Sequence, residues 1–516
     1  MKMNFGIVVL LFVLCLLTRE SFAQGGVSLW TNRFNGTGSN NDEAKAVASD
    51  LYGNVVIAGT SVDAGNSSPK FAIIKCSSMG TPLWTNRYHG DVVSALGVDV
   101  SGNGNVYVVG NTYRPTSGGR DFVTLAYSSS GIPLWTNTYQ NRTDGIGSDL
   151  ATALAVGGNG NIYVTGYSSE TNSTRTAYAT IAYSSSGVPL WTNRYTGSTS
   201  TLVGSGAYAI AVGANGNVYV TGLSQGDHFT DYATIAYSSD GAVLWINRYG
   251  GGVCPDQAKS IAVDNETGNV YVTGYSDFLV DGNPDYVTIG YSSSGLALWT
   301  NRLYSSGRNI PVAMAVGANG DVIVTGSSSN AFSGNDFSTI AYSSLGVPLW
   351  TNRYNGPANA GDAPYGMALD KSGNIFVTGY SAAIETGNDY VTLAYSSEGV
   401  PLWTNRYNRS LNYLDIAQAV TVDGDGNVVV TGRSDSNGFN NSHDFVTIKY
   451  AGQSPSPIPI EVQKAGAEIV LTWLDARFEL QSAPSATGTY TNVLGAASPY
   501  TNASPDWQQY FRLKAN

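Results

Sequence analysis

Leu402-Trp403-Thr404-Asn405-Arg406-Tyr407 is the stretch that decides the fold, because the chain carries eight close copies of it. The copies are marked by Trp30, Trp84, Trp135, Trp191, Trp245, Trp299, Trp350 and Trp403. Successive tryptophans lie 54, 51, 56, 54, 54, 51 and 53 residues apart. A fixed period of this length indicates an array of equivalent supersecondary units.

One repeat, residues 356–407, contains four short runs of residues that favour β-strands. The runs 364–369, 374–379, 389–395 and 402–407 are separated by Gly, Ser, Asn and Asp. Short β-rich runs bounded by turn residues predict four strands per repeat, which is the content of one propeller blade. We therefore predict an all-β chain whose main part is an eight-bladed β-propeller of four-stranded antiparallel blades.

The phase of the repeat predicts how the ring closes. The first copy of the hexapeptide, around Trp30, precedes the first complete repeat, and the last repeat ends with a third strand at 444–450. The last blade therefore lacks a fourth strand of its own. We predict that the segment around Trp30 pairs with 444–450, because closure removes the open sheet edges that promote aggregation.

The first strand of each repeat alternates small and large side chains. Small residues include Ala44, Ala46 and Ala48, and the large positions are Val47, Leu96, Leu154, Ile210, Ile261, Met314, Met367 and Val420. We predict that the large face of one blade packs on the small face of the next, which lets crowded blades reach native density. The tryptophans are expected to bury the outer parts of the blades.

The repeat resembles the bacterial SBBP β-propeller repeats. The similarity rests on Asp389-Tyr390, the following glycine turn, and the pattern Asp-x-x-Gly-Asn-x-x-Val-Thr-Gly, which recurs through 25–452. The resemblance implies a secreted or surface-exposed bacterial protein and implies no reaction. It also implies seven blades, whereas the count of repeats in this chain predicts eight.

Residues 1–23 have the pattern of a secretory signal peptide. Lys2 supplies the positive start, 5–17 is apolar, and Ser21-Phe22-Ala23 is a small-x-small cleavage site. The apolar run is too short for a membrane span, so a retained anchor is the weaker alternative. We predict a protein that is secreted, either extracellular or in the bacterial cell envelope.

Charge excludes several classes of partner. The formal net charge is −11 and only 12% of residues are charged. Binding of nucleic acid or anionic membranes needs clustered Lys and Arg, so neither partner is expected, and no membrane span is expected either. Cys76 and Cys254 lie in different repeats, so we expect no disulfide. The chain is expected to be monomeric.

The sequence changes character after the last repeat. Residues 453–457 form a Pro/Ser linker, and 458–516 predict a small C-terminal β-sandwich-like module. This module resembles the short sandwich at the ends of secreted Verrucomicrobia-type proteins, through 471–473, 480–483 and 510–513. The resemblance implies a sorting or attachment role, and a passive cap is the alternative.

One position near the start of the first strand changes from repeat to repeat while its neighbours hardly vary. It reads Lys45, Ser94, Thr152, Tyr208, Lys259, Val312, Tyr365 and Gln418. The loops that vary in length lie on the same face of the predicted disc, and loops on a rigid scaffold often carry function. We predict that Lys45, Tyr208, Lys259 and Tyr365 contact a ligand near the axis. The alternative is packing at a mouth of uneven shape.

Repeated carboxylates have a structural interpretation. Asp389 is expected to fall opposite Arg406 in a hairpin, with Asp231–Arg248 and Asp285–Arg302 as equivalent pairs. Asp423, Asp425 and Asn427 have the spacing of calcium ligands, but no glutamate follows as in an EF-hand. An ordinary hairpin turn is the favoured interpretation, so no cofactor is predicted and calcium is kept as an alternative.

No motif for nucleophilic or metal catalysis occurs in the sequence. The sequence therefore favours a secreted, non-catalytic binding scaffold for a protein or a glycan. One alternative is an extracellular carbohydrate-active lyase or hydrolase with carboxylates at the channel mouth. The other is a structural cell-surface protein anchored by 458–516.

Overall fold

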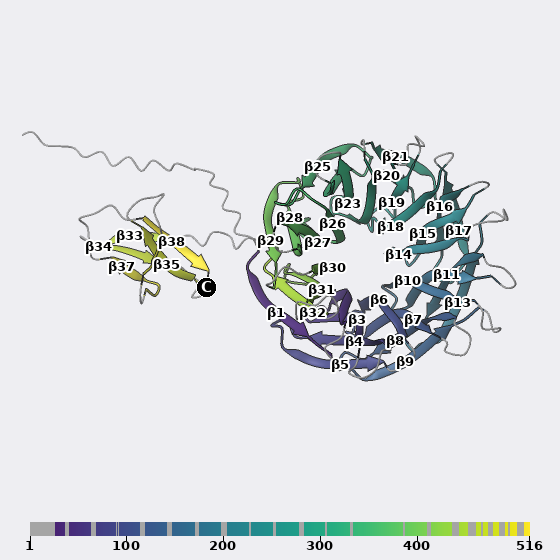
Figure 1. Ribbon diagram of the computed structural model, residues 1–516, viewed down its shortest axis with the longest axis horizontal. Coiled ribbons are helices and arrows are strands. Elements are labelled where there is room, and N and C mark those ends of the chain that lie inside the picture. Colours follow the sequence, from purple (N-terminus) through teal and green to yellow (C-terminus); the bar gives the residue numbers. More distant parts are fainter. Residues whose placement is uncertain are drawn as a thin grey trace, which may run out of the picture.

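The repeats form a closed ring of sheets around a central opening (Figure 1). The computed structural model describes residues 26–36, 41–62, 69–88, 90, 92–113, 119–141, 147–170, 175–197, 204–226, 229–250, 254–277, 283–304, 307–330, 334–384, 387–409, 414–435, 443–452, 461–465, 468–472, 478–483, 491–493, 496–502 and 510–515. Within these ranges every regular element is a strand, and no helix is long and apolar enough to cross a membrane.

Eight four-stranded antiparallel sheets confirm the predicted number of blades, one more than the family resemblance implies. Blade 1 comprises β2 (Glu43–Ser49), β3 (Val55–Val62), β4 (Pro69–Cys76) and β5 (Pro82–Tyr88). Blade 2 comprises β6 (Val92–Val100), β7 (Val106–Tyr113), β8 (Arg120–Tyr127) and β9 (Pro133–Tyr139). Blade 3 comprises β10 (Asp149–Val156), β11 (Ile162–Ser169), β12 (Thr176–Tyr183) and β13 (Pro189–Tyr195). Blade 4 comprises β14 (Gly206–Val212), β15 (Val218–Gln225), β16 (Thr230–Tyr237) and β17 (Val243–Tyr249).

The second half of the ring repeats this order. Blade 5 comprises β18 (Asp256–Val263), β19 (Val270–Ser276), β20 (Asp285–Tyr291) and β21 (Ala297–Leu303). Blade 6 comprises β22 (Asn309–Val316), β23 (Val322–Asn330), β24 (Gly334–Tyr342) and β25 (Pro348–Tyr354). Blade 7 comprises β26 (Asp362–Leu369), β27 (Ile375–Ala383), β28 (Gly387–Tyr395) and β29 (Pro401–Tyr407). Blade 8 comprises β30 (Asp415–Val422), β31 (Val428–Asp435), β32 (His443–Tyr450) and the N-terminal β1 (Ser28–Phe34).

Pairing of β1 with β32 confirms the predicted closure. The register runs antiparallel from Ser28–Tyr450 to Phe34–Phe445. In the other blades a hairpin turn joins the third strand to the fourth. In blade 8 the ends of the two strands are instead joined by a hydrogen bond, which the Ala451 N–H donates to the Val27 carbonyl over 2.9 Å. The ring is thus sealed by backbone hydrogen bonds between residues more than 400 positions apart in the sequence.

The repeated hexapeptide joins each blade to the next one. Its tryptophan Nε1 donates to a backbone carbonyl of the next blade at 2.9–3.1 Å in all eight blades. Its asparagine Nδ2 donates to a glycine carbonyl there at 2.6–2.8 Å. In the turn after Ser78, Gly80 has φ +82° and any Cβ would lie 2.8 Å from the Trp30 ring, so this position requires glycine.

The arginine of the hexapeptide reaches the opposite way, to the preceding blade. Arg33 donates to the Tyr407 hydroxyl over 2.8 Å, and Arg406 donates to the Tyr354 hydroxyl over 3.1 Å. Arg194 with Tyr139 and Arg302 with Tyr249 repeat the arrangement. In these four blades the hexapeptide therefore bonds both neighbouring blades, whereas blade 2 has Thr138 at the arginine position.

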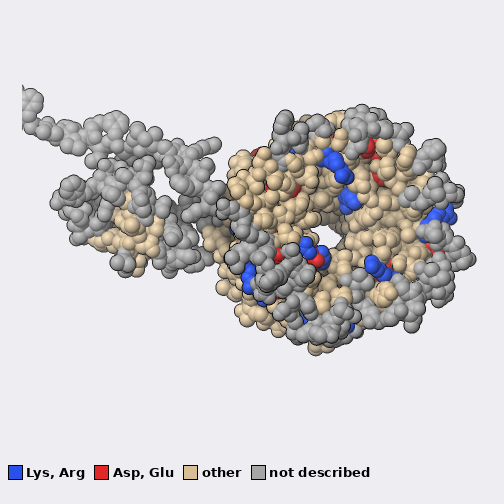
Figure 2. All heavy atoms as spheres, viewed as in Figure 1, with Lys and Arg blue, Asp and Glu red and all other residues tan. Residues whose placement is uncertain are grey.

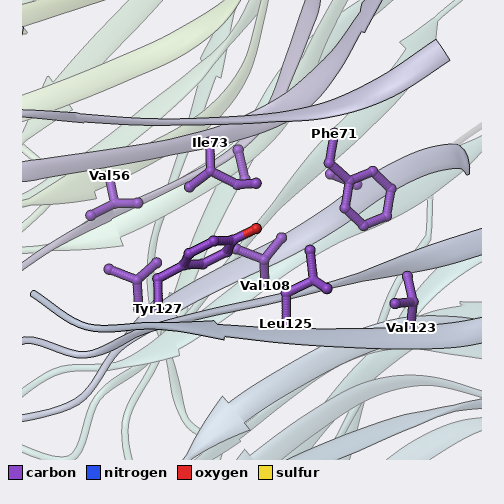
Figure 3. Packing of buried hydrophobic residues seen from close by; sticks show 10 residues of the cluster. Val56, Phe71, Ile73, Val108, Val123, Leu125 and Tyr127 are labelled. Carbon is purple, nitrogen blue, oxygen red and sulfur yellow. The ribbon is translucent and has the colours of Figure 1, made fainter. Parts of the chain in front are cut away.

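The hydrophobic core lies between adjacent blades (Figure 3). In the cluster between blades 1 and 2, Phe71 and Ile73 of β4 face Leu125 and Tyr127 of β8. The predicted packing of large on small residues occurs between the first strands, where the Leu154 side chain lies over Gly97 of the preceding blade. Close interdigitation of this kind brings the interior to native density.

One residue of the predicted large face was misplaced. In blade 2 the residue equivalent to Val47 is Val98, because Val47 pairs with Ile57 and Val98 pairs with Val108. Leu96 instead stands at a break in the strand pairing. The prediction for this one position is wrong: Val98 lies eight residues before Val106, as Val47 lies eight residues before Val55, so the large position falls two residues after Leu96.

The interface between blades 8 and 1 lacks an aromatic contact that the other seven interfaces share. In seven blades the tryptophan packs on a tyrosine of the next blade, as Trp84 does on Tyr127 with ring centroids 6.1 Å apart. Cys76 occupies the tyrosine position opposite Trp30, and it borders a cavity of about 110 Å³. Burial raises the pKa of the Cys76 thiol, so it stays protonated at neutral pH.

Filling this cavity should stabilise the ring. We expect Cys76→Tyr to raise the unfolding free energy by about 0.5–1.5 kcal/mol, the value of an added aromatic pair. The reverse change, Tyr127→Cys, should create an equivalent gap between blades 1 and 2 and lower stability by about 2–4 kcal/mol. Denaturant titration of both variants measures the effect. A loss of stability in Cys76→Tyr would mean that the space beside Cys76 cannot hold the larger side chain.

The C-terminal residues form two small sheets. One contains β33 (Glu461–Ala465), β34 (Glu468–Thr472) and β37 (Tyr500–Asn502), and the other contains β35 (Phe478–Ala483), β36 (Thr491–Asn492) and β38 (Tyr510–Ala515). Leu471 and Leu480 are buried together, with Tyr500 and Phe511 packed against them. The predicted signal peptide, 1–23, and the linker, 453–457, lie outside the described residues.

Candidate ligand site at the mouth of the central opening

Each first strand contains a β-bulge close to its start. In blade 1 the pairing passes from Ala44–Gly59 to Ala46–Ala58, so Lys45 has no partner in the ladder. The bulged residues of the eight blades are Lys45, Leu96, Thr152, Tyr208, Lys259, Val312, Tyr365 and Gln418. Bulges redirect side chains, and the first strands lie nearest the axis (Figure 1). We call these eight residues the mouth ring.

The mouth ring matches the predicted variable position in seven blades and corrects it in blade 2. Ser94 was assigned to this position, but Ser94 pairs with Asn111 in the regular ladder. The bulge falls on Leu96, directly after the Ala95–Gly110 pair. β6 has a second register shift, between Val92 and Ser94, which the other first strands lack, so its start does not align with theirs.

Tyr208 and Lys259 are brought together by neighbouring blades. The Lys259 Nζ lies 4.9 Å from the centre of the Tyr208 ring and 5.6 Å from that of the Tyr275 ring. Gln257 connects the two phenols, since its Nε2 donates to the Tyr208 oxygen and its Oε1 accepts from the Tyr275 hydroxyl, both over 2.9 Å. Blades 4 and 5 thus build one cluster of two tyrosines, an amide and an ammonium, which we call the tyrosine–lysine cluster.

Partial burial sets the ionisation of this cluster. Burial lowers the pKa of Lys259 because the charged ammonium loses hydration. Burial also raises the pKa of Tyr208 to about 12, which keeps the phenol protonated and able to donate a hydrogen bond at neutral pH. In the described part of the chain, no carboxylate lies within ion-pair distance of the Lys259 ammonium, and the two aromatic ring faces are its cation partners.

Lys45 has a different environment between blades 8 and 1. Its Nζ lies 2.7 Å from Glu43 Oε1, which Gln418 also approaches at 3.3 Å and Arg433 at 3.5 Å. The charge of Lys45 is therefore matched by a carboxylate within the protein. Tyr365, in blade 7, is 44% exposed and packs on Tyr380 with ring centroids 5.9 Å apart.

Sequence reasoning missed the residues that support the mouth ring. Tyr275, Tyr380 and Arg433 each directly follow the glycine that ends the regular part of a second strand. Across the eight blades this position reads Thr60, Asn111, Tyr167, Leu223, Tyr275, Ser327, Tyr380 and Arg433. It varies between constant neighbours, so the criterion that selected the mouth ring would also have selected this second column.

The repeated aspartate–arginine pairs form, but their register differs from the prediction. Arg406 Nη2 lies 2.9 Å from Asp389 Oδ2, and Arg248 lies 2.7 Å from Asp231. The residue directly opposite Arg406 is Val391, so Asp389 is a diagonal neighbour two positions away. The turn leaves five residues between the paired Tyr395 and Pro401, and a bulge between Ala394 and Tyr395 adds one more. The prediction of direct opposition is therefore wrong, while both side chains stay on one face.

The calcium-like turn uses its first carboxylate for protein contacts. Asp423 Oδ1 accepts the backbone N–H groups of Asp425 and Asn427 at 3.0 and 2.9 Å. Its Oδ2 lies 2.6 Å from the ammonium of Lys449. Among the residues that the structure describes, no group of three or more His, Cys, Asp or Glu side chains is arranged to hold a metal ion.

A hollow on the other face of the ring is lined by the turns between first and second strands. It has a volume of about 370 Å³ and lies among blades 7, 8 and 1, with Asp50, Asp370, Lys371 and Asp425 on its wall. Asp50 repeats the arrangement of Asp423, since it lies 2.9 Å from the buried Lys75. Burial acts to raise the pKa of Asp50, but hydrogen bonds from Asn54 and Lys75 outweigh it and hold the pKa below 3.8.

The Asp50–Lys75 pair predicts a pH-dependent contribution to stability. Because the pKa of Asp50 is lower in the folded protein, the stabilisation is present above about pH 4 and is lost as the pH falls through the lowered pKa. The stability difference between the native protein and Asp50→Asn should therefore be constant near neutrality and shrink in acid. Urea titrations between pH 7 and pH 3 measure it.

Asp370→Asn is the matched control, because Ala394 occupies the position of the lysine in blade 7. A difference of the same size and pH dependence for Asp370→Asn would assign the effect to the turn rather than to the ion pair.

Comparison with known proteins identifies one repeat of the chain. Residues 353–383 match the family described as SBBP, beta-propeller repeat. No curated protein matches the chain significantly.

Solved structures resemble the chain only distantly. Sqt1 from Chaetomium thermophilum is 13% identical, with a TM-score of 0.45, over 82% of this chain and 98% of that one. Polysaccharide lyase Uly1 is 12% identical, with a TM-score of 0.43, over 70% and 90% of the two chains. The propeller domain of the Trilobed protease from Pyrococcus furiosus is 7% identical, with a TM-score of 0.40, over 70% and 96%. The chain is thus an eight-bladed β-propeller that carries an SBBP-type repeat.

Proposed function

We propose that the protein is a non-catalytic binding scaffold that holds a protein or glycan ligand at the mouth ring. One observation carries the proposal. The contacts between blades repeat eight times with almost constant geometry, whereas the bulged residue that each blade places at the mouth differs in size, polarity and charge. A rigid frame that presents unlike side chains around one centre is the usual organisation of a binding site.

The polar residues of the mouth also favour binding over catalysis by carboxylates. Glu43, two residues before Lys45, is an acid beside the mouth ring, and Lys45 and Arg433 engage it. A general acid or base must be free to exchange a proton with its substrate, and an ion-paired carboxylate is poorly suited to that role. Lyase or hydrolase activity is therefore the second outcome to be tested, and a structural surface role is the third.

The proposal includes a location and a use for the C-terminal residues. We propose that 1–23 direct secretion, that 25–452 bind the ligand, and that 458–516, joined by 453–457, attach the protein to the cell envelope. The pattern of 1–23 and the low content of charged residues, 12%, support it. The proposal needs no cofactor, no nucleic acid and no partner subunit.

Glycan arrays and protein pull-downs with the mature chain test the proposal. The informative variant combines Lys45→Ala, Tyr208→Ala, Lys259→Ala and Tyr365→Ala, and its control carries Lys371→Ala and Asp425→Ala on the opposite face. A ligand lost by the first variant and kept by the second supports the mouth ring. Equal binding by both, at unchanged melting temperature, would contradict it. Deletion of 458–516 should release the protein from cells without affecting the ligand.

A further inference from the structure

Lys259 is the lysine of the mouth ring whose charge the described protein leaves without an anion. Lys45 stands at the equivalent bulge in blade 1 and is paired with Glu43 at 2.7 Å. Lys259 is half-buried between Tyr208 and Tyr275, and its nearest described partners are their ring faces. Removing a cation from water costs free energy unless an anion or hydrogen-bond acceptors replace the water. An anionic ligand at this point would satisfy the ammonium.

The hydrogen bonds of the cluster leave a second donor beside it. The Tyr275 hydroxyl gives its proton to Gln257 Oε1, and Gln257 Nε2 in turn donates to the oxygen of Tyr208. Tyr208 acts as acceptor in this chain of bonds, so its own proton is directed elsewhere. The cluster can therefore offer an ammonium and a phenol proton to one ligand group, which is the donor pair that a carboxylate accepts.

Cations extend from the tyrosine–lysine cluster along one side of the mouth. Arg308 is exposed at the entrance to blade 6, and its charge acts to lower the pKa of Tyr275. Arg120 is exposed at the start of β8, and its charge acts to lower the pKa of Tyr167. Figure 2 shows Lys and Arg side chains along the rim of the central opening. This concentration of positive charge occurs in a chain whose net charge is −11. We call Arg120, Lys259 and Arg308 the cationic arc.

We propose that the cationic arc binds an acidic glycan, with the carboxylate of one sugar residue held by Lys259 and the Tyr208 hydroxyl. The amide of Gln257 and the tyrosine rings suit the remainder of such a sugar, because its hydroxyl groups need neutral hydrogen-bonding partners and its C–H faces pack on aromatic rings. Successive carboxylates along the chain would meet Arg308 and Arg120. A purely acidic peptide would use the arginines but gain little from the phenol and amide groups. The proposal rests on the binding function proposed above and specifies its ligand.

Binding of defined oligosaccharides tests the assignment. The probes are oligogalacturonate, oligoguluronate and hyaluronan fragments, each paired with its carboxyl-reduced counterpart, together with a poly-glutamate peptide, titrated calorimetrically into the mature chain. At least one uronate should bind, and reduction of its carboxyl groups should weaken binding about tenfold or more, as expected for loss of a charge-assisted hydrogen bond.

Lys259→Met should lower the affinity for the uronate by a similar factor, and Lys259→Arg should retain much of the affinity. Lys371→Met is the matched control, because it removes one positive charge on the opposite face and should leave binding unchanged. Each variant is first compared by thermal melting, so that a folding defect is separated from a binding defect.

The outcomes separate this inference from the proposed function. Three outcomes would overturn the acidic-glycan assignment: no uronate binds, reduced and acidic sugars bind equally, or Lys259→Met binds as tightly as the native protein. If another ligand, including poly-glutamate, were then lost by the combined mouth variant, the binding function would stand with a different ligand. If no ligand depended on the mouth ring, both proposals would fall.

Discussion

Replacing Trp403 by alanine should be among the most damaging single substitutions in the ring, with a loss of about 3–5 kcal/mol of unfolding free energy. Trp403 is 1% exposed and lies between Phe376 and Tyr450, each with ring centroids 5.8 Å away. Its Nε1 also donates to the Gly452 carbonyl over 3.1 Å. The substitution would remove a large buried ring and a hydrogen bond together, and chemical denaturation of the purified chain measures the loss.

The position of Trp403 explains why its loss should exceed that of its equivalents. Elsewhere the tryptophan and asparagine of the hexapeptide bond to a continuous hairpin turn, but at this interface Trp403 bonds Gly452 and Asn405 bonds Gly26. The interface between blades 7 and 8 therefore holds both chain segments that close the ring. We also expect faster hydrogen exchange in β1 and β32 of Trp403→Ala, because closure depends on this contact.

Trp84→Ala is the matched control for Trp403→Ala. Trp84 occupies the same hexapeptide position, but it is only partly buried and packs on Tyr127 at 6.1 Å. Its removal should lower the unfolding free energy by less and should leave hydrogen exchange in β1 unchanged. Equal losses of stability for the two variants would show that the deeper burial of Trp403 between blades 7 and 8 does not add to stability.

The second large effect is expected from breaking the buried pair of Asp423 and Lys449. The two side chains are 0% and 3% exposed, their charged atoms lie 2.6 Å apart, and Lys449 also donates to the Ser78 carbonyl over 3.0 Å. Asp423→Ala would leave a buried ammonium without its counter-charge, which typically costs about 3–5 kcal/mol. Urea titration at neutral pH measures the loss.

A double variant separates the pair from the rest of the interface. Blade 4 has Gly213 and Ala236 at the positions of Asp423 and Lys449, and its interface is otherwise built alike. Asp423→Gly with Lys449→Ala should therefore recover much of the stability that Asp423→Ala loses, because no charge is left buried. A double variant as unstable as the single one would show that the turn bonds of Asp423, rather than its charge, carry the effect.

The sequence contains enough information to predict the blades but not their contacts. Strand composition, turn glycines and the spacing of the tryptophans are local features, and they correctly predicted four strands per repeat and eight blades. The phase of the repeat correctly predicted that β1 completes blade 8. Register was less predictable: Arg406 lies opposite Val391 rather than Asp389, and the bulge of β6 falls on Leu96 rather than Ser94.

The candidate site was likewise predictable in part from the sequence and decided in part by the tertiary structure. The sequence by itself determined that one position per blade varies near the axis, and thereby selected Lys45, Tyr208, Lys259 and Tyr365. Only the tertiary structure decided that Lys45 is neutralised by Glu43 while Lys259 lies between two tyrosine rings. The physical reason is that these contacts join different strands or blades at separations set by ring curvature and bulges, which no local sequence pattern encodes.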